Sequence, residues 1–162
     1  MSAREIMVRV SDLQVGREGD TLITLGLGSC VAVILHDAAS RLGGMAHIML
    51  PSKSLSRRPD LPGRVPETAV PALLEKLGIM GANPRRLTAR LVGGASLFAS
   101  LSPPGSIQMG ERNLVACRQV LNSHGLPITG ELVGGESGRS VWFTVGDGKV
   151  LVRSAAQLEY AL

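Results

Sequence analysis

Two apolar runs separated by a short polar turn decide the fold: Cys30-Val-Ala-Val-Ile-Leu35 and Gly43-Gly-Met-Ala-His-Ile-Met-Leu50. β-Branched and apolar residues fill the first run, which is typical of a buried strand. Pro51 ends the second run, because proline cannot donate to a strand ladder. The intervening His36-Asp-Ala-Ala-Ser-Arg41 has the polar and small side chains of a turn. The stretch therefore predicts a buried β-hairpin.

Similar patterns outside the hairpin predict more strands and two helices. We expect strands at residues 5–10, 21–27, 87–92, 128–132, 140–145 and 149–153. Two segments place apolar residues at helical spacing and stop at a glycine: Glu67–Leu77 before Gly78, and Glu111–His124 before Gly125. Many strands, two or three helices and no linker predict an α+β fold with a single domain over residues 1–162.

The composition excludes several classes of protein. The 162 residues carry 17 Lys and Arg against 13 Asp and Glu, a net charge of +4, and 44% of them are hydrophobic. Such a chain is globular rather than disordered, and its apolar runs are too short for membrane insertion. One Trp, one Tyr and two Phe leave few rings to stack on bases, so we expect no nucleic acid partner. The N-terminal residues mix charged with apolar side chains and lack a hydrophobic signal core, which favours a cytoplasmic location.

The two cysteines differ in their sequence context. Cys117 lies on the apolar face of the second predicted helix, where a free thiol packs as a small hydrophobe. Cys30 instead follows Gly26-Leu-Gly28-Ser29, where the glycines permit a sharp turn and a close backbone approach. Backbone N–H groups near Gly28 and Ser29 are then available to hold an oxyanion beside the sulfur. We therefore predict that Cys30 is a nucleophile and that Cys117 is structural.

His47 is the candidate base. A hairpin centred on the turn at residues 37–40 sets Cys30 directly opposite His47. Opposed residues have Cβ atoms about 4.5–5.5 Å apart, within reach of a thiol–imidazole contact that lowers the thiol pKa. A buried cysteine beside a hydrogen-bonded core histidine gives the same pattern, and the spacing alone leaves both interpretations open.

A third group is needed to orient the imidazole and fix its tautomer. Thr24, on the preceding predicted strand, or a backbone carbonyl can take this part. Asp37 lies in the turn at the far end of the hairpin, too far away for that task. His36 beside the turn and His124 at the end of a predicted helix are expected to be structural.

Residues 51–66 are a polar loop that contains four basic side chains and a single acidic one, Asp60. The basic residues are Lys53, Arg57, Arg58 and Arg64. A loop of this length without structure of its own is unusual in a compact domain and is often functional. A solvated and partly mobile excursion is the alternative interpretation.

Motifs in a fixed order span the chain from about Val8 to Arg153. The specific ones are Leu25-Gly-Leu-Gly-Ser-Cys30-Val-Ala-Val33 and Gly43-Gly-Met-Ala-His47-Ile-Met-Leu-Pro51. The supporting ones are Leu91-Val-Gly-Gly-Ala-Ser-Leu-Phe98, Met109-Gly-Glu-Arg-Asn113 and Val133-Gly-Gly-Glu-Ser-Gly-Arg139. Together they resemble the CheD family, the chemoreceptor glutamine deamidases of chemotaxis. One departure is Arg90, where most members are expected to have lysine; the charge is kept, although the two side chains bond differently.

The resemblance implies a cysteine hydrolase that converts particular receptor glutamines to glutamate and releases ammonia. Carried over by motif, Cys30 is the nucleophile, His47 the base and Thr24 the third member, and no metal or cofactor is expected. The implied fold is an α/β sandwich of mostly antiparallel strands flanked by helices, related to toxin deamidases of the cysteine-hydrolase type. Slow hydrolysis of glutamyl methyl esters is a plausible side activity, because the ester presents a similar acyl carbon.

The implied partners are the cytoplasmic helices of methyl-accepting chemoreceptors and a CheC-type phosphatase. Receptor helices are rich in Glu, so the basic loop that follows the His47 strand would steer them toward the site. The alternative function is a binding module that regulates the phosphatase without catalysis.

Overall fold

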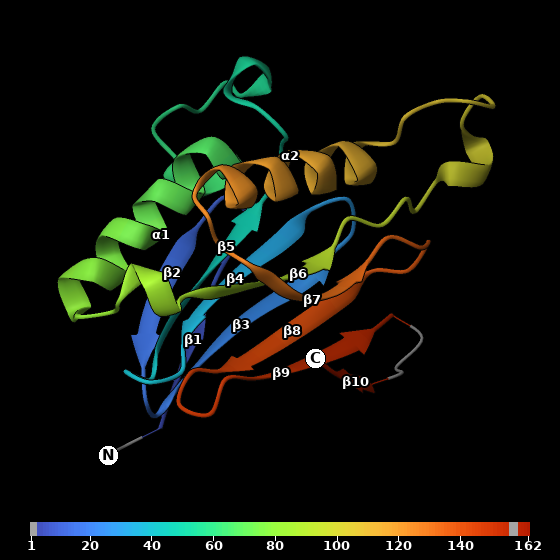
Figure 1. Cartoon of the computed structure of the whole chain (residues 1–162). Coiled ribbons are helices and arrows are strands. Elements are labelled where there is room, and N and C mark those ends of the chain that lie inside the picture. Colours follow the sequence, from blue (N-terminus) through green and yellow to red (C-terminus); the bar gives the residue numbers. More distant parts are fainter. Residues whose placement is uncertain (1–2, 156–158) are drawn as a thin grey trace.

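The computed structural model describes residues 3–155 and 159–162, which form three layers (Figure 1). Within these residues, two five-stranded sheets pack face to face, and two α-helices cover the free face of one of them. We call the helix-covered sheet, β2-β5-β4-β6-β7, the central sheet, and β1-β3-β8-β9-β10 the outer sheet. The predicted α+β class is confirmed. Both helices, however, lie on the same side of the strands.

The strands are mostly antiparallel, as the family resemblance implies; only the pairs β1–β3 and β6–β7 are parallel among the pairings described. The central sheet contains β2 (Leu13–Arg17), β5 (Leu42–Ile48), β4 (Val31–Asp37), β6 (Thr88–Gly93) and β7 (Ile128–Val133). The outer sheet contains β1 (Arg4–Met7), β3 (Asp20–Leu27), β8 (Arg139–Thr144), β9 (Lys149–Ser154) and β10 (Glu159–Ala161).

The helices α1 (Pro66–Met80) and α2 (Met109–Ser123) pack side by side, α1 against β5 and β2, and α2 against β4 and β7. The chain also forms short 3₁₀ turns at η1 (Lys53–Leu55), η2 (Pro62–Arg64), η3 (Pro84–Arg86) and η4 (Ala99–Leu101). None of the helices in the described ranges is long and apolar enough to cross a membrane.

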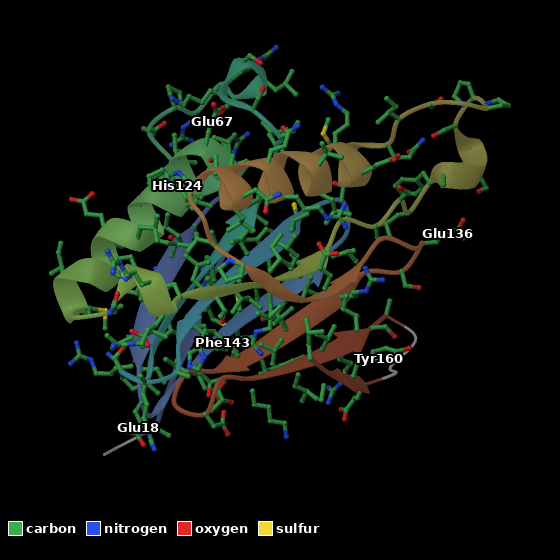
Figure 2. The ribbon with its side chains drawn as sticks, viewed as in Figure 1. Glu18, Glu67, His124, Glu136, Phe143 and Tyr160 are labelled. Atoms are coloured by element: carbon green, nitrogen blue, oxygen red, sulfur yellow. The ribbon has the colours of Figure 1, made fainter. Side chains whose placement is uncertain are left out.

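The sequence analysis placed the C-terminal end of each helix at a glycine, and only one of the two placements is correct. The prediction that α1 stops at Gly78 is wrong, because the helix continues to Met80 and ends at Gly81, whose left-handed backbone breaks it. The second prediction is confirmed. Gly125 has the left-handed backbone of a helix terminator and follows His124, the exposed residue at the end of α2 (Figure 2).

Side chains along β4 alternate between two hydrophobic clusters. Val33 packs in the cluster under the helices, with Leu73 of α1 and Leu121 of α2. Ile34 points the other way, into the cluster between the sheets that contains Phe143 of β8 (Figure 2). A strand buried on both faces has no polar side, which explains the unbroken apolar run over residues 31–35 of β4.

Candidate active site

The predicted hairpin forms, but its register differs from the prediction. The ladder closes between Asp37 and Leu42, so His47 lies opposite Ala32, and Cys30 immediately precedes β4. The predicted direct opposition of Cys30 and His47 is therefore wrong by two residues. A shift of two keeps side chains on the same face of the sheet, and Cys30 packs against the same cluster as Ala32, the residue opposite His47. Continued ladder geometry would make Cys30 a diagonal neighbour of His47, with Cα atoms about 7–8 Å apart.

Thr24 and His47 form a buried hydrogen-bonded pair. The Thr24 Oγ1 lies 2.7 Å from His47 Nδ1 and 2.6 Å from the carbonyl oxygen of Val8. A carbonyl can only accept, so the single hydroxyl proton goes to Val8, and the hydroxyl oxygen accepts the Nδ1–H of the imidazole. This fixes the tautomer and leaves a lone pair on Nε2, which is buried and has no partner among the described residues.

One short segment, residues 8–12, positions both members of this pair. The Val8 carbonyl holds Thr24 through the bond above. The Ser11 N–H donates to the carbonyl of His47, and the His47 N–H donates to the carbonyl of Asp12, both at 3.0 Å. The histidine is thus fixed through its backbone and its ring together.

The electrostatics of the site favour neutral side chains. Burial lowers the pKa of His47 to about 4. The ring nitrogen is bonded to a hydroxyl and not to a carboxylate, so this bond brings no negative charge that would raise the pKa again. Burial also raises the pKa of the Cys30 thiol. Both shifts run against the expectation that the imidazole lowers the thiol pKa, and they favour a thiol beside a neutral imidazole over a thiolate–imidazolium pair in the free protein.

Two glycines at the end of β6 allow the backbone to pass close to Cys30. The Gly94 N–H donates to the carbonyl of Cys30, and the Ala95 N–H donates to the carbonyl of Gly28, both at 2.8 Å. Gly93 has a φ of 111°, and a Cβ there would overlap the Cys30 carbonyl oxygen. These bonds fix the loop that carries the sulfur.

Asn113 of α2 is a site residue to which the sequence analysis gave no role. Its side chain is fully buried, and its Nδ2 donates to the carbonyls of Ser29 at 2.9 Å and Met49 at 3.1 Å. These carbonyls lie next to Cys30 and two residues beyond His47, respectively. The motif that ends at Asn113 was visible in the sequence, but nothing local linked it to the cysteine.

A pocket of about 220 Å³ lies beside the cysteine loop. It is lined by Ser29, Ala95, Ser96, Leu97, Phe98, Gln108, Met109 and Gly110. Residues 96–108, which we call the apolar arm, extend from the body of the protein between β6 and α2 (Figure 1). The arm exposes large apolar side chains, with Phe98 69% and Leu101 81% exposed.

Two of the four basic residues of loop 51–66 are engaged within the protein. Arg58 forms an ion pair with Asp60 at 2.9 Å. Arg64 is half-buried and donates from Nη1 to the Ser11 hydroxyl at 3.1 Å. Its carbonyl accepts the N–H groups of residues 49 and 50, just after β5. Arg64 therefore supports the His47 strand instead of facing a partner.

The other two basic residues, Lys53 and Arg57, are exposed. The Lys53 N–H donates to the side chain of Glu67 at the start of α1, beneath the loop (Figure 2). The loop also contains the turns η1 and η2, so the expectation that it lacks structure of its own is wrong.

The remaining candidates have structural surroundings. Cys117 lies on the fully buried face of α2, and burial raises its pKa to about 12. His36 Nε2 bonds to the carbonyl of Val145 at 2.8 Å. Asp37 forms an ion pair with Arg86, which holds the pKa of its carboxyl well below the usual range. No group of three or more His, Cys, Asp or Glu side chains suited to a metal occurs in residues 3–155 and 159–162.

Comparison with known proteins gives consistent matches. The model of a family described as CheD, chemotactic sensory transduction, matches residues 49–154. The probable chemoreceptor glutamine deamidase CheD of Desulforamulus reducens is 37% identical over 93% of this chain and 90% of its own length. The protein of the same name from Methanococcus vannielii is 42% identical over 95% of this chain and 97% of its own. Among solved structures, the hypothetical protein YfiH of Bacillus licheniformis aligns with a TM-score of 0.44 and 15% identity, covering 76% of this chain and 49% of that one. The family match and the nearly full-length relatives show that this chain belongs to the CheD family.

Proposed function

We propose that this protein is a chemoreceptor glutamine deamidase with Cys30 as nucleophile, His47 as base and Thr24 as the residue that orients the base. The observation that carries the proposal is the Thr24–His47 bond, which leaves an unpaired Nε2 on the face of the sheet that Cys30 shares. The names of the relatives support the choice of substrate.

In the first half of the reaction, the Cys30 sulfur attacks the carboxamide carbon of a glutamine side chain while its proton passes to His47 Nε2. The N–H groups of Ser29 and Cys30 hold the oxyanion, next to the Gly28 carbonyl that Ala95 anchors. The imidazolium then gives its proton to the leaving nitrogen. The C–N bond breaks, ammonia departs and a thioester remains.

In the second half, water attacks the thioester carbon while His47 Nε2 takes one of its protons. The C–S bond breaks, the sulfur recovers a proton from the imidazolium, and glutamate is released. Throughout, Thr24 keeps its bond to Nδ1, so only Nε2 gains and loses a proton. A glutamyl methyl ester presents the same acyl carbon, so slow ester hydrolysis follows from the same steps.

The surface beside the site suits a helical substrate. The apolar arm offers exposed Leu97, Phe98 and Leu101 next to the pocket, and Lys53 and Arg57 add positive charge on the loop that follows β5. An amphipathic receptor helix rich in Glu has the complementary apolar and acidic character. Because these helices are cytoplasmic, the proposal places the protein in the cytoplasm, with a fold of the cysteine-hydrolase, toxin deamidase-like type.

A CheC-type phosphatase is the second proposed partner. The exposed apolar side chains of the arm exceed what catalysis on a single glutamine requires, and large exposed apolar groups mark binding surfaces. If the protein were only a binding module for the phosphatase, it would bind tightly while leaving receptor glutamines unchanged.

The test of the proposed function is mass spectrometry of receptor cytoplasmic fragments incubated with the protein. We expect conversion of particular glutamines to glutamate, a gain of about 1 Da at each. The Cys30→Ala variant should abolish conversion, and the Cys117→Ala variant, which changes the buried thiol, should retain it. Conversion that survives Cys30→Ala would refute the mechanism, and no conversion by the wild type would refute the function.

A further inference from the structure

We propose that Asn113 is a positioning residue that aims the Cys30 N–H at the oxyanion of the reaction. The inference rests on the proposed function and adds to it a residue outside the Cys30, His47 and Thr24 set. It starts from an unusual arrangement: a fully buried amide whose single nitrogen donates to two backbone carbonyls, those of Ser29 and Met49.

The link from Asn113 to the oxyanion is the planarity of the peptide group. The carbonyl of Ser29 and the N–H of Cys30 belong to one trans peptide and point in opposite directions. By holding the Ser29 oxygen, Asn113 therefore fixes the direction of the Cys30 N–H. On the other side, the Gly94 N–H holds the Cys30 carbonyl at 2.8 Å, so the peptides before and after the nucleophile are both anchored.

The Cys30 N–H is itself free for a ligand. Across the described ranges, neither it nor the N–H of Ser29 donates to another group of the chain. Both belong to the loop beside the pocket, which Ser29 lines. A free donor with a fixed direction is what stabilisation of a developing oxyanion requires, because the donor need not reorient during the reaction.

The orientation of the Asn113 amide is unambiguous, because both of its partners are carbonyls and only the nitrogen can donate to them. The Oδ1 is left buried without a partner in the part of the chain that the structure describes. An unpaired buried acceptor destabilises a fold. A residue that lowers stability in this way is expected where it serves the reaction, and here it fixes the direction of the Ser29–Cys30 peptide.

The bond to Met49 places the same side chain between two strands. The β4–β5 ladder extends to the pair Val31 and Ile48 and goes no further. Beyond that pair, the segments that continue β4 and β5 are joined through Asn113, which donates to the carbonyls of Ser29 and Met49. The separation between the cysteine loop and the end of the His47 strand is thus set by a residue of α2.

The test compares two reactions of the same sulfur in the Asn113→Ala variant. Deamidation passes through an oxyanion, whereas alkylation by iodoacetamide displaces iodide at a saturated carbon and forms none. We expect kcat for deamidation to fall about tenfold to a hundredfold, less than the loss of a whole oxyanion donor, with KM nearly unchanged. The alkylation rate of Cys30 should stay within about twofold of the wild type, since its thiol and base are untouched.

The matched control is Asn122→Ala, which removes an exposed amide from the same helix and should change neither reaction. A second variant, Asn113→Asp, keeps the shape and donates one hydrogen bond only while its carboxyl is protonated. Its deamidation rate should therefore decline as the pH rises through the carboxyl pKa, a decline that the wild type lacks. This profile still decides the question if Asn113→Ala fails to fold in a thermal melt.

The possible failures are distinguishable. If deamidation and alkylation slow equally, Asn113 only maintains the structure of the site, and an unchanged kcat excludes any positioning role. In either case conversion by the wild type leaves the proposed function intact. If the wild type converts no glutamine, the proposed function fails and this inference fails with it.

Discussion

At the level of single residues, the site depends on a hydroxyl where many hydrolases use a carboxylate. The Thr24 hydroxyl accepts a hydrogen bond from the Nδ1–H of His47 and donates one to the Val8 carbonyl. A hydroxyl fixes the tautomer but brings no negative charge to stabilise an imidazolium. This explains why burial can lower the pKa of His47 to about 4 without opposition.

The role of Thr24 can be tested by removing only its hydroxyl. Thr24→Val keeps the shape and should lower kcat by about 10–100-fold, because the neutral ring is then free to adopt either tautomer or to turn. Thr24→Ser restores the hydroxyl and should recover most of the rate. Steady-state deamidation of a receptor fragment measures both. Equal rates for Thr24→Val and the wild type would mean that the backbone alone orients the ring.

The pH dependence follows from the direction of the His47 shift. The base acts when it is neutral, and a pKa of about 4 keeps it neutral throughout the mildly acidic range. We expect kcat/KM to decline on the acid side only near pH 4, and not near about 6.5, where an ordinary histidine titrates. A pH–rate profile decides; a midpoint above about 6 would instead indicate a thiolate–imidazolium pair.

The same shift affects stability. In the unfolded chain His47 has its ordinary pKa, so between about pH 6.5 and 4 the unfolded state binds more protons than the folded state. The free energy of unfolding should therefore fall as the pH is lowered through this window. Thermal melts of the wild type and His47→Gln, which cannot titrate, should show a smaller pH effect in the variant. A wild-type dependence no larger than that of His47→Gln contradicts the shift.

At the level of elements, the sequence predicts all of the interior strands in the described ranges but only two of the four edge strands, β1 and β7. Residues 31–35 of β4 are all apolar because the strand is buried on both faces. The two strands that the sequence analysis missed, β2 and β10, are both at sheet edges, where burial imposes a weaker pattern. In β2, Leu13 and Val15 are the only strongly apolar residues.

The site was predictable to the extent that its residues lie in local motifs. Cys30 follows a glycine-rich turn just before β4, and His47 lies on the neighbouring β5, which carries two glycines near its start, so the motifs are visible in the sequence. Their register was not, because turn length decides it and two extra residues in the turn leave the pattern unchanged. The contacts of Asn113 join α2 to the residues just before β4 and just after β5, over 84 and 64 residues, and no local spacing encodes such a distance.

The apolar arm makes a prediction of its own. Phe98→Ser and Leu101→Ser each remove a largely exposed apolar side chain beside the pocket and should raise KM for a receptor fragment about tenfold with little change in kcat. The control is Ile79→Ser, an equally exposed apolar residue on α1. If all three variants keep the wild-type KM, the substrate docks elsewhere.

At the level of the whole molecule, the site lies where the three layers meet. The outer sheet contributes Thr24, the central sheet His47 and the start of β4 Cys30, while α2 contributes Asn113. The pocket and the apolar arm lie at the same end of the molecule, because residues of the arm line the pocket. We therefore expect substrate approach to depend on the surface around this end, including loop 51–66.

The net charge of +4 gives that approach a testable electrostatic component. Lys53 and Arg57 are exposed and form no ion pair among the described residues, whereas the exposed Arg58 pairs with Asp60 and the half-buried Arg64 bonds to Ser11. The double variant Lys53→Gln with Arg57→Gln should lower kcat/KM several-fold at low salt and show a weaker dependence on ionic strength.

The control for this variant is Arg85→Gln, an exposed cation in η3 at the far end of β4 from Cys30. At about 1 M salt, where screening acts within about 3 Å, the double variant and the wild type should converge, because steering between separated charges is lost. Receptor-fragment deamidation over a salt series measures the slopes. If the double variant and Arg85→Gln lose rate equally, the attraction comes from the overall charge and not from the loop, and parallel slopes for all three proteins mean that charge plays no part in docking.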